Sequence, residues 1–229
     1  MRIWDIHPGY LNRLSLLGEH RELHGLVSII VNGKKGYSHH PETMRWVGYG
    51  WAIKQRHREL VCEMVLRGYA DKSPVKTRSN KGNWPSLYID KPHIQFQLLK
   101  EKYKEKEEGR IPLPNNEQEL WSQHKYSVLA RNQNRYKTIG RGISSRKISF
   151  ENLALELVEI LRTPPTEGGI RNAVQHMWGY VSEEHKGGSD DIESWSLKKL
   201  LIYTQKNAKK FNEPYINKST ALSELMVWL

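Results

Sequence analysis

Two histidines and a glutamate in the run HRELH have the types and spacing that could support chemistry. His20 and His24 lie four residues apart, so one helix face would carry both imidazoles, and such a pair can bind a metal ion. Zinc-protease helices place Glu directly after the first His, whereas Arg21 stands there and its charge opposes a cation. His20 also falls within an apolar stripe, where a core histidine is the commoner explanation. The sequence therefore predicts no metal site and no cofactor.

Glu22, in the same run, is a candidate acid or base. On a helix that starts its apolar stripe at Leu16, Glu22 falls on the shoulder of the stripe and Arg21 faces solvent. We therefore expect Glu22 to be half-buried, and desolvation raises the pKa of a half-buried carboxylate. An ordinary ion pair at the rim of the core is the alternative, and periodicity alone favours it.

Two stretches could contact phosphate groups. Lys34 lies in the turn GKKG, which could equally be a solvated turn. Residues 121–141 interleave basic and aromatic side chains, a pattern that suits backbone contact and base stacking. We expect Lys125 and Arg131 to bind nucleic acid, and we expect the aromatic residues to belong to the core; these are Trp121, Tyr126 and Tyr136.

The composition favours a polyanionic partner. Among 229 residues, 36 Lys and Arg face 25 Asp and Glu, which gives a net charge of +11. Residues 1–110 hold 20 of these basic residues against 12 acidic ones. Positive charge favours nucleic acid because each neutralised phosphate releases counterions, although a Lys-rich soluble surface would show the same excess.

Several classes of protein are excluded by the sequence. The single Cys62 excludes an internal disulfide framework and a Cys-based zinc cluster. No run of about eighteen apolar residues predicts a membrane span. The N-terminus carries charges and lacks the apolar core of a secretory signal. We therefore expect a soluble cytoplasmic protein without membrane contact.

The elements that must position these residues are helices. One apolar stripe runs from Leu16 to Ile30 and ends at Asn32-Gly33, and a second runs from Ile53 to Met64 and ends at Arg67-Gly68. Pro41 suits another helix start. Residues 71–92 are rich in Pro, Gly, Ser and Lys and predict a long loop. A third helix is expected from His93 through the stretch KEKYKEKEE.

The segment GRIPLPNN, from Gly109 to Asn116, predicts a domain boundary. Helical patterns with polar caps follow it at 117–132, 134–140, 149–162, 167–184, 190–209 and 219–228, and their expected caps are Asn116, Ser149, Thr166, Ser189 and Ser219. No alternating pair of strands with a hairpin turn is evident. The sequence predicts an all-α protein with domains at 1–110 and 115–229.

Short runs in the first domain carry a family resemblance. They are Arg21-Glu22-Leu23, Asn32-Gly33-Lys34, Leu66-Arg67-Gly68-Tyr69 and Pro92-His93. In their order and spacing, residues 1–106 resemble the pyrimidine-dimer DNA glycosylase family, the phage-type endonuclease V. The resemblance implies a compact helical domain that acts on cyclobutane pyrimidine dimers in double-stranded DNA.

The same resemblance implies a mechanism. In the family, the α-amine of the first residue attacks C1′ of the damaged nucleotide, releases the base through an imine, and cleaves the strand by β-elimination. The first residue corresponds to Met1, the essential Glu to Glu22, and phosphate-binding arginines to Arg2 and Arg21. An α-amine titrates near 7.7–8.0, so it is nucleophilic at neutral pH without special tuning. Arg2 is expected to prevent removal of Met1.

The sequence departs from the family at two positions that contact DNA or the lesion. Gly25 stands where the family has a basic residue, and Ser15 stands where it has a histidine. These departures leave the chemistry possible, and they leave the identity of the lesion open.

The second domain resembles a helical domain of unknown function that is also found fused to thiouracil desulfidase domains. The matching features are Trp121, His124-Lys125-Tyr126, Tyr136, Gly140, Pro164-Pro165-Thr166, Asn172, His176, Gly179 and Tyr180. The resemblances together predict a DNA repair glycosylase with AP lyase activity. A non-catalytic nucleic-acid-binding protein is one alternative. A tRNA-directed pyrimidine-modifying enzyme or accessory, which contacts RNA through the second domain, is another.

Overall fold

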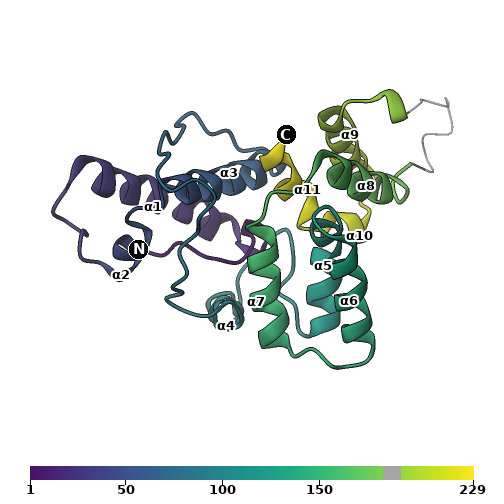
Figure 1. Cartoon of the computed structure of the whole chain (residues 1–229), viewed down its shortest axis with the longest axis horizontal. Coiled ribbons are helices and arrows are strands. Elements are labelled where there is room, and N and C mark those ends of the chain that lie inside the picture. Colours follow the sequence, from purple (N-terminus) through teal and green to yellow (C-terminus); the bar gives the residue numbers. More distant parts are fainter. Residues whose placement is uncertain (183–191) are drawn as a thin grey trace. The chain divides into compact units, whose positions relative to one another are not determined.

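The computed structural model describes residues 1–182 and 192–229 (Figure 1). The chain divides into two compact units, Met1–Gly109 (unit 1) and Arg110–Leu229 (unit 2). Throughout the described residues the regular structure is helical and includes no strand, which confirms the all-α fold class. Within the same residues, no helix combines the length and apolarity needed to cross a membrane.

Unit 1 is built on two long helices that pack on each other, α1 (Arg13–Asn32) and α3 (Gly50–Leu66). Their contact buries the predicted stripes, including Leu16, Leu23, Ile53 and Leu60, all at most 1% exposed. The 3₁₀ turn η1 (Pro8–Tyr10) precedes them, and the shorter helices α2 (Pro41–Trp46) and α4 (Pro92–Lys102) complete the unit.

Helix ends in unit 1 follow local signals. The side chain of Asn12 accepts a hydrogen bond from the amide of Ser15 and caps α1, which ends at Gly33 with a left-handed φ of 60°. Gly68 ends the turn after α3 in the same left-handed region. The predicted third helix was too long: α4 ends at Lys102 because the chain turns after Tyr103, whose buried hydroxyl accepts a hydrogen bond from the amide of Asn12.

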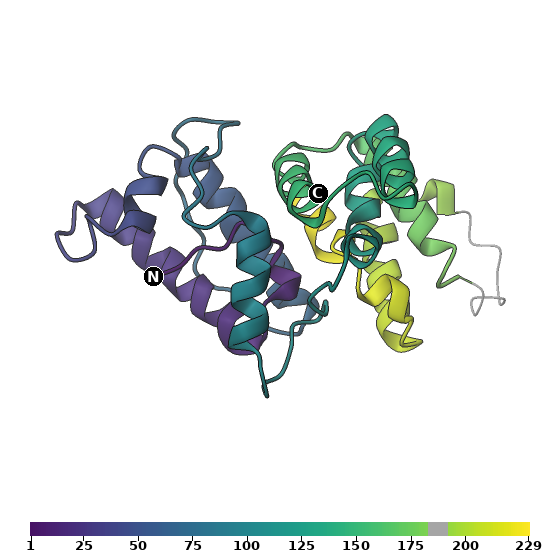
Figure 2. The same cartoon turned by 90° about the horizontal axis from the view of Figure 1, so that it is seen from below.

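The first seven residues form an extended arm in unit 1. Ile3, Trp4 and Ile6 are buried. The arm runs between α1 and α4, because the amide of Trp4 donates to Glu19 of α1 and the amide of Asp5 donates to Gln95 of α4 (Figure 2). The start of the chain is therefore held by the core of unit 1.

Unit 2 is arranged around α5 (Glu117–Leu129). It packs against α6 (Gln133–Ser144), α7 (Phe150–Leu161), α8 (Glu167–Trp178) and α11 (Ala221–Glu224). Helix α9 (Leu197–Lys210) packs on α8, and the remaining elements are α10 (Pro214–Asn217) and the 3₁₀ turns η2 (Ile192–Ser194) and η3 (Leu225–Trp228). Gly169 permits a close approach of α8, since a Cβ there would lie 2.0 Å from the carbonyl oxygen of Ala130.

The helix starts of unit 2 match their expected caps at Asn116, Ser149 and Thr166. The ends match less well. Helix α8 stops at Trp178, where Val181 turns back to donate to the carbonyl of Trp178. Helix α9 begins after Ser196, and the expected cap Ser189 lies outside the described residues. The predicted C-terminal helix is split into α11 and η3, and the hydroxyl of its expected cap Ser219 accepts a hydrogen bond from the amide of Ala221.

Candidate functional site

Two carboxylates of α1 bind the backbone of the N-terminal arm. The amide of Arg2 donates to Oε2 of Glu22 at 2.6 Å, and the amide of Trp4 donates to Oε1 of Glu19 at 3.2 Å. Glu19 and Glu22 are three residues apart and share one side of the helix. The register of the arm along α1 is therefore set by two charge-assisted hydrogen bonds.

This anchoring places the α-amine of Met1 beside Glu22. The nitrogens of Met1 and Arg2 are separated by three covalent bonds and lie within about 3.7 Å of each other. Since the Arg2 amide is 2.6 Å from the carboxylate, the amine lies within about 6 Å of it. Met1 is half-exposed. The α-amine of Met1 and the carboxylate of Glu22 thus share one accessible site.

The expectation that Glu22 is half-buried was wrong. Glu22 is exposed, because it lies beyond the edge of the buried face of α1 and the first residues of the arm do not cover it. Glu19, three residues earlier, takes the buried position at 2% exposure. Glu22 is therefore open to a bound substrate, and Glu19 is not.

Two arginines adjoin this site, Arg2 in the arm and Arg21 next to Glu22 in the sequence of α1. The guanidinium of Arg2 pairs with Asp90 and lies 5.0 Å from the ring of Trp4, with the side chain 33% exposed. Arg21 is exposed, as expected, and its Nε donates to the carbonyl of Leu17 on its own helix. Lys34 is also exposed, and it follows the end of α1, where the ten residue steps from Glu22 to Asn32 give a helix rise of about 15 Å. The structure therefore groups Met1, Arg2 and Glu22, keeps Arg21 next to Glu22 on α1, and leaves Lys34 apart.

Buried ion pairs also hold the arm in place. Arg56 of α3 donates to both carboxylate oxygens of Glu19 at 2.8 and 3.0 Å and to the carbonyl of Ile6 at 3.0 Å. Burial raises the pKa of Glu19, and the charge of Arg56 opposes that rise. On the other side, Arg45 of α2 pairs with Asp5 and with Glu42. The arm is thus held by charges that are almost fully buried.

Sequence reasoning missed these supporting residues, although a signal existed. Glu19 and Arg56 each interrupt the apolar face of a helix, and their charges are opposite. Opposite charges on the buried faces of two packed helices are expected to pair, because an isolated buried charge is costly. Asp90 and Gln95 gave no comparable signal, since tertiary folding alone brings them to the arm.

The two histidines of α1 lie close to a third histidine and to an aspartate. His57 of α3 and Asp71, in the segment after α3, join His20 and His24, and one ligand atom from each lies within 4.8 Å of all the others. The ring centroids of the three histidines are 4.7 to 5.2 Å apart. Sequence reasoning placed His57 on the second apolar stripe but did not connect the two stripes.

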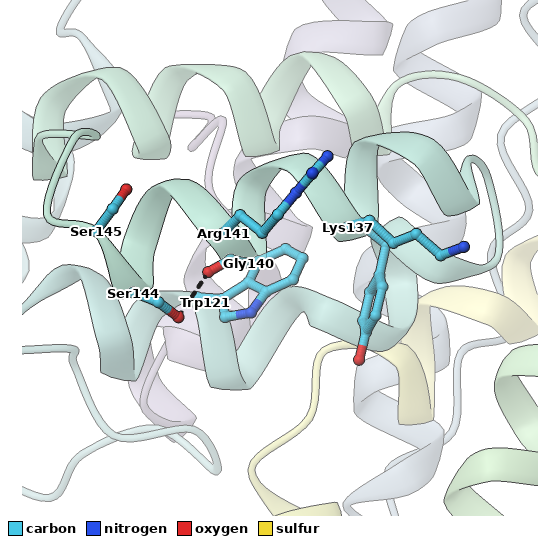
Figure 3. Close-up of a pocket in the computed structure, with 7 residues that line it drawn as sticks. Trp121, Lys137, Gly140, Arg141, Ser144 and Ser145 are labelled. Atoms are coloured by element: carbon cyan, nitrogen blue, oxygen red, sulfur yellow. Dashed lines mark hydrogen bonds between the residues drawn. The ribbon is translucent and has the colours of Figure 1, made fainter.

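In unit 2, α5 and α6 line a hollow of about 660 Å³ (Figure 3). Trp121 lies against Gly140, and the basic side chains of Lys137 and Arg141 project from α6 beside it. Trp121 is 7% exposed and its ring centroid is 5.4 Å from that of Tyr136. The hollow therefore combines an aromatic wall with two cations.

Lys125 lies at a neighbouring hollow of about 350 Å³, which Tyr126, Tyr136, Lys137, Asn172, His176 and Tyr180 also line. Its ammonium is 4.8 Å from the ring centroid of Tyr126 and 4.6 Å from that of Tyr215. Burial and the neighbouring hydroxyls of Tyr180 and Tyr215 raise the pKa of Tyr126. Tyr126 is therefore a neutral part of the core, as expected of that residue.

Arg131 does not have the free guanidinium that nucleic-acid binding needs. Its side chain is 3% exposed, and it makes two hydrogen bonds to the carboxylate of Glu224. Three more go to the carbonyls of Ser127, Leu161 and Thr163. These five bonds use every donor direction of the guanidinium to tie α5 to α11 and to the end of α7. The expectation for Arg131 is therefore corrected to a structural role.

Comparison with known families divides the chain in two. Residues 1–77 match the family model described as pyrimidine dimer DNA glycosylase. Residues 125–225 match the model described as protein of unknown function (DUF1722). The chain joins these two family segments. The first match contains the arm, Glu22 and the three clustered histidines, and it supports a glycosylase-like function on DNA. Searches of curated proteins and of solved structures gave no match.

Proposed function

We propose that unit 1 is a DNA N-glycosylase and AP lyase that acts on cyclobutane pyrimidine dimers. In this proposal the α-amine of Met1 is the nucleophile and Glu22 is the catalytic carboxylate. The observation that carries the proposal is the hydrogen bond from the Arg2 amide to Glu22, which holds the start of the chain beside an exposed carboxylate. The family match over residues 1–77 supplies the substrate class.

The proposed chemistry uses one amine and one carboxylate. The amine of Met1 bonds to C1′ as the glycosidic bond breaks, and the departing base takes the bonding electron pair and a proton. Glu22 stabilises the positive charge that develops at the sugar. The C1′–O4′ bond then breaks, O4′ takes a proton that the amine gives up, and a protonated imine forms. Loss of a proton from C2′ of this imine expels the 3′ phosphate, and Glu22 accepts that proton. Hydrolysis of the imine releases the amine.

The anchored arm contributes by positioning. A nucleophile on a free chain end would sample many orientations, and each lost degree of freedom would have to be recovered in the transition state. Here the arm is fixed at Arg2, Trp4 and Asp5 by side chains of α1 and α4. Arg2 and Arg21 hold the phosphates on either side of the lesion, and Asp90 orients Arg2 for that contact.

The two departures from the family have different structural consequences. Ser15 is 6% exposed in the first turn of α1, so a side chain at that position cannot reach DNA. Gly25 is exposed, and a Cβ there would meet nothing within 4 Å. The surface beside Glu22 and Arg21 therefore has room for a basic side chain that this sequence does not supply.

Reductive trapping tests the proposal directly. The full chain, with its N-terminal residue verified by mass spectrometry, is incubated with borohydride and either abasic or ultraviolet-irradiated duplex DNA. We expect a covalent adduct whose peptide map places the bond on the amine of Met1. Specific binding to irradiated duplex without any adduct would instead establish a non-catalytic binding protein.

For unit 2 we propose an auxiliary role in binding nucleic acid, because one of its hollows pairs the wall of Trp121 with the cations of Lys137 and Arg141. The double substitution of Lys137 and Arg141 by Ala should weaken binding of the full chain to duplex DNA. Lys209→Ala, which removes an exposed cation from α9, is the matched control. Equal affinities for the double variant and the control would exclude this surface, and competition with tRNA measures whether RNA occupies it.

A further inference from the structure

The histidine cluster of unit 1 brings together side chains from three segments. His20 and His24 come from one face of α1, His57 comes from α3, and Asp71 comes from the segment that follows α3. The Nε2 atom of His20 is 3.3 Å from one carboxylate oxygen of Asp71, and that of His57 is 3.6 Å from the other. The carboxylate thus lies between two imidazoles.

One ring nitrogen of each histidine in this cluster lacks a hydrogen-bond partner. The Nε2 atoms of His20, His24 and His57 are all buried, and none makes a hydrogen bond of acceptable geometry. Buried polar atoms in folded proteins are normally paired, and those left unpaired call for an explanation such as an ion. Three unpaired imidazole nitrogens that converge on one point are not what an ordinary set of core histidines would show.

The cluster also offers suitable donor atoms to a cation. Each imidazole can bind a metal ion through the lone pair of one ring nitrogen, and Asp71 adds a carboxylate oxygen. Arg21, whose charge argued against a metal, is exposed and bonds to Leu17, so it does not face the cluster.

We propose that His20, His24, His57 and Asp71 bind one Zn²⁺ ion in a four-ligand site. Three imidazoles and one carboxylate suit zinc better than magnesium or calcium, which prefer oxygen ligands. Ligand atoms around a tetrahedral zinc are roughly 3.3 Å apart, so small side-chain rotations would contract the present cluster onto the ion. With all four positions filled by protein, the site is structural.

The ion would fasten α1 to α3 and to the segment that follows α3. His20 and His24 flank Arg21 and Glu22 in sequence, so the zinc site would fix the helix turn that carries the candidate catalytic carboxylate. This role is independent of the glycosylase chemistry, and it would hold for a protein that only binds DNA.

A cobalt titration of the full chain tests the site. The protein carries a C-terminal tag without histidines and is stripped with a chelator. We expect one equivalent of Co²⁺ to give the visible absorption of a tetrahedral complex, and Zn²⁺ to displace it while Mg²⁺ does not. Zn²⁺ at a hundredfold excess over its Kd should raise the thermal midpoint of the stripped protein by roughly 5–10 °C.

Substitutions identify the ligands. His24→Gln and His57→Gln should each abolish the cobalt absorption, whereas His39→Gln, which changes an exposed histidine of unit 1, should leave it intact. Circular dichroism reports whether each variant folds. If a variant unfolds, the imidazole resonances of His20, His24 and His57 in the wild-type protein decide the assignment, because zinc should shift all three. Less than a tenth of an equivalent of bound Co²⁺, or binding that leaves those resonances unchanged, would overturn the proposal.

Discussion

The four residues HREL occur twice in unit 1, at His20–Leu23 on α1 and at His57–Leu60 on α3, and the structure uses them in parallel up to a point. Leu23 and Leu60 are buried in the same core, and the arginine of each run is exposed. The histidine of each run enters the same cluster. Helical periodicity is therefore sufficient to decide the face on which the histidine, the arginine and the leucine of each run lie.

The two glutamates have different partners. Glu22 is exposed and accepts the amide of Arg2, whereas Glu59 is 14% exposed and accepts a hydrogen bond from Arg56 on its own helix. The residue before each run explains the contrast. Glu19 precedes the first run and Arg56 precedes the second, and these two pair with each other at 2.8 Å. That pair brings the two runs together and leaves Glu22 available for the arm.

The largest expected effect comes from displacing the α-amine of Met1, which lies beside Glu22 of the first run. One residue added before Met1 displaces the amine by up to about 3.8 Å, and misplacement of about 1 Å can already cost a hundredfold in rate. An uncleaved N-terminal tag or acetylation should therefore abolish borohydride trapping and strand cleavage without changing circular dichroism or the thermal midpoint. A tag after Leu229 is the control. Trapping at the normal rate by a verified tagged protein would place the nucleophile elsewhere.

The next effect compares the glutamates themselves. Glu22→Gln keeps the shape of the side chain but removes its charge, so strand cleavage should fall by about a hundredfold or more while the free energy of unfolding stays nearly unchanged. Glu59→Gln should show the reverse pattern: cleavage near the wild-type rate and a loss of about 1 kcal/mol in stability, because a charge-assisted bond to Arg56 is weakened. Single-turnover cleavage and urea unfolding measure the two quantities. Equal cleavage rates for the two variants would mean that Glu22 contributes no more to catalysis than Glu59 does.

A third effect, on the free energy of unfolding, follows from the ion pair between Glu19 and Arg56. Glu19→Gln leaves the 2% exposed guanidinium of Arg56 without its main counter-charge, and breaking a buried pair from one side costs about 3–5 kcal/mol. We expect urea unfolding to show a loss of that order. Glu101→Gln at the end of α4 breaks a pair with Lys104 in which both side chains are exposed, at 71% and 69%, and it should cost less. A loss for Glu19→Gln no larger than for Glu101→Gln would show that the central pair does not hold the helices together.

The sequence predicted the helices of unit 1 better than the contacts between them. The stripes of α1 and α3, and the glycines that end them, are local signals, and both helices appear where periodicity placed them. The end of α4 was missed because it depends on the hydroxyl of Tyr103 reaching Asn12, a contact between residues 91 positions apart. Local helix propensity does not depend on a contact between residues so far apart in the sequence.

The same limit applies to the candidate sites. Periodicity placed Glu22 near the edge of the core, but its exposure depends on the path of the arm, which leaves it uncovered. Arg131 has the residue type expected of a phosphate contact, yet its partner Glu224 lies 93 residues further along the chain. The histidine cluster required the pairing of α1 with α3. Residue type and spacing indicated which chemistry was available, and tertiary packing decided which residues take part.

The smallest expected effect compares the arginines of the two runs, which are alike in their exposure and in their place after the clustered histidine. If Arg21 contacts a phosphate beside the site, Arg21→Ala should make the log–log dependence of DNA affinity on salt shallower by about 0.9, the amount expected for one phosphate. Arg58→Ala removes an equally exposed charge from α3, and Lys104→Ala removes one after α4 that is 69% exposed and pairs with Glu101. Neither should change the slope, because neither residue is next to Glu22 in the sequence. Fluorescence anisotropy with undamaged duplex at several salt concentrations measures all three slopes. Identical slopes would mean that the positive field of unit 1 acts as a whole, and that Arg21 has no special contact with DNA.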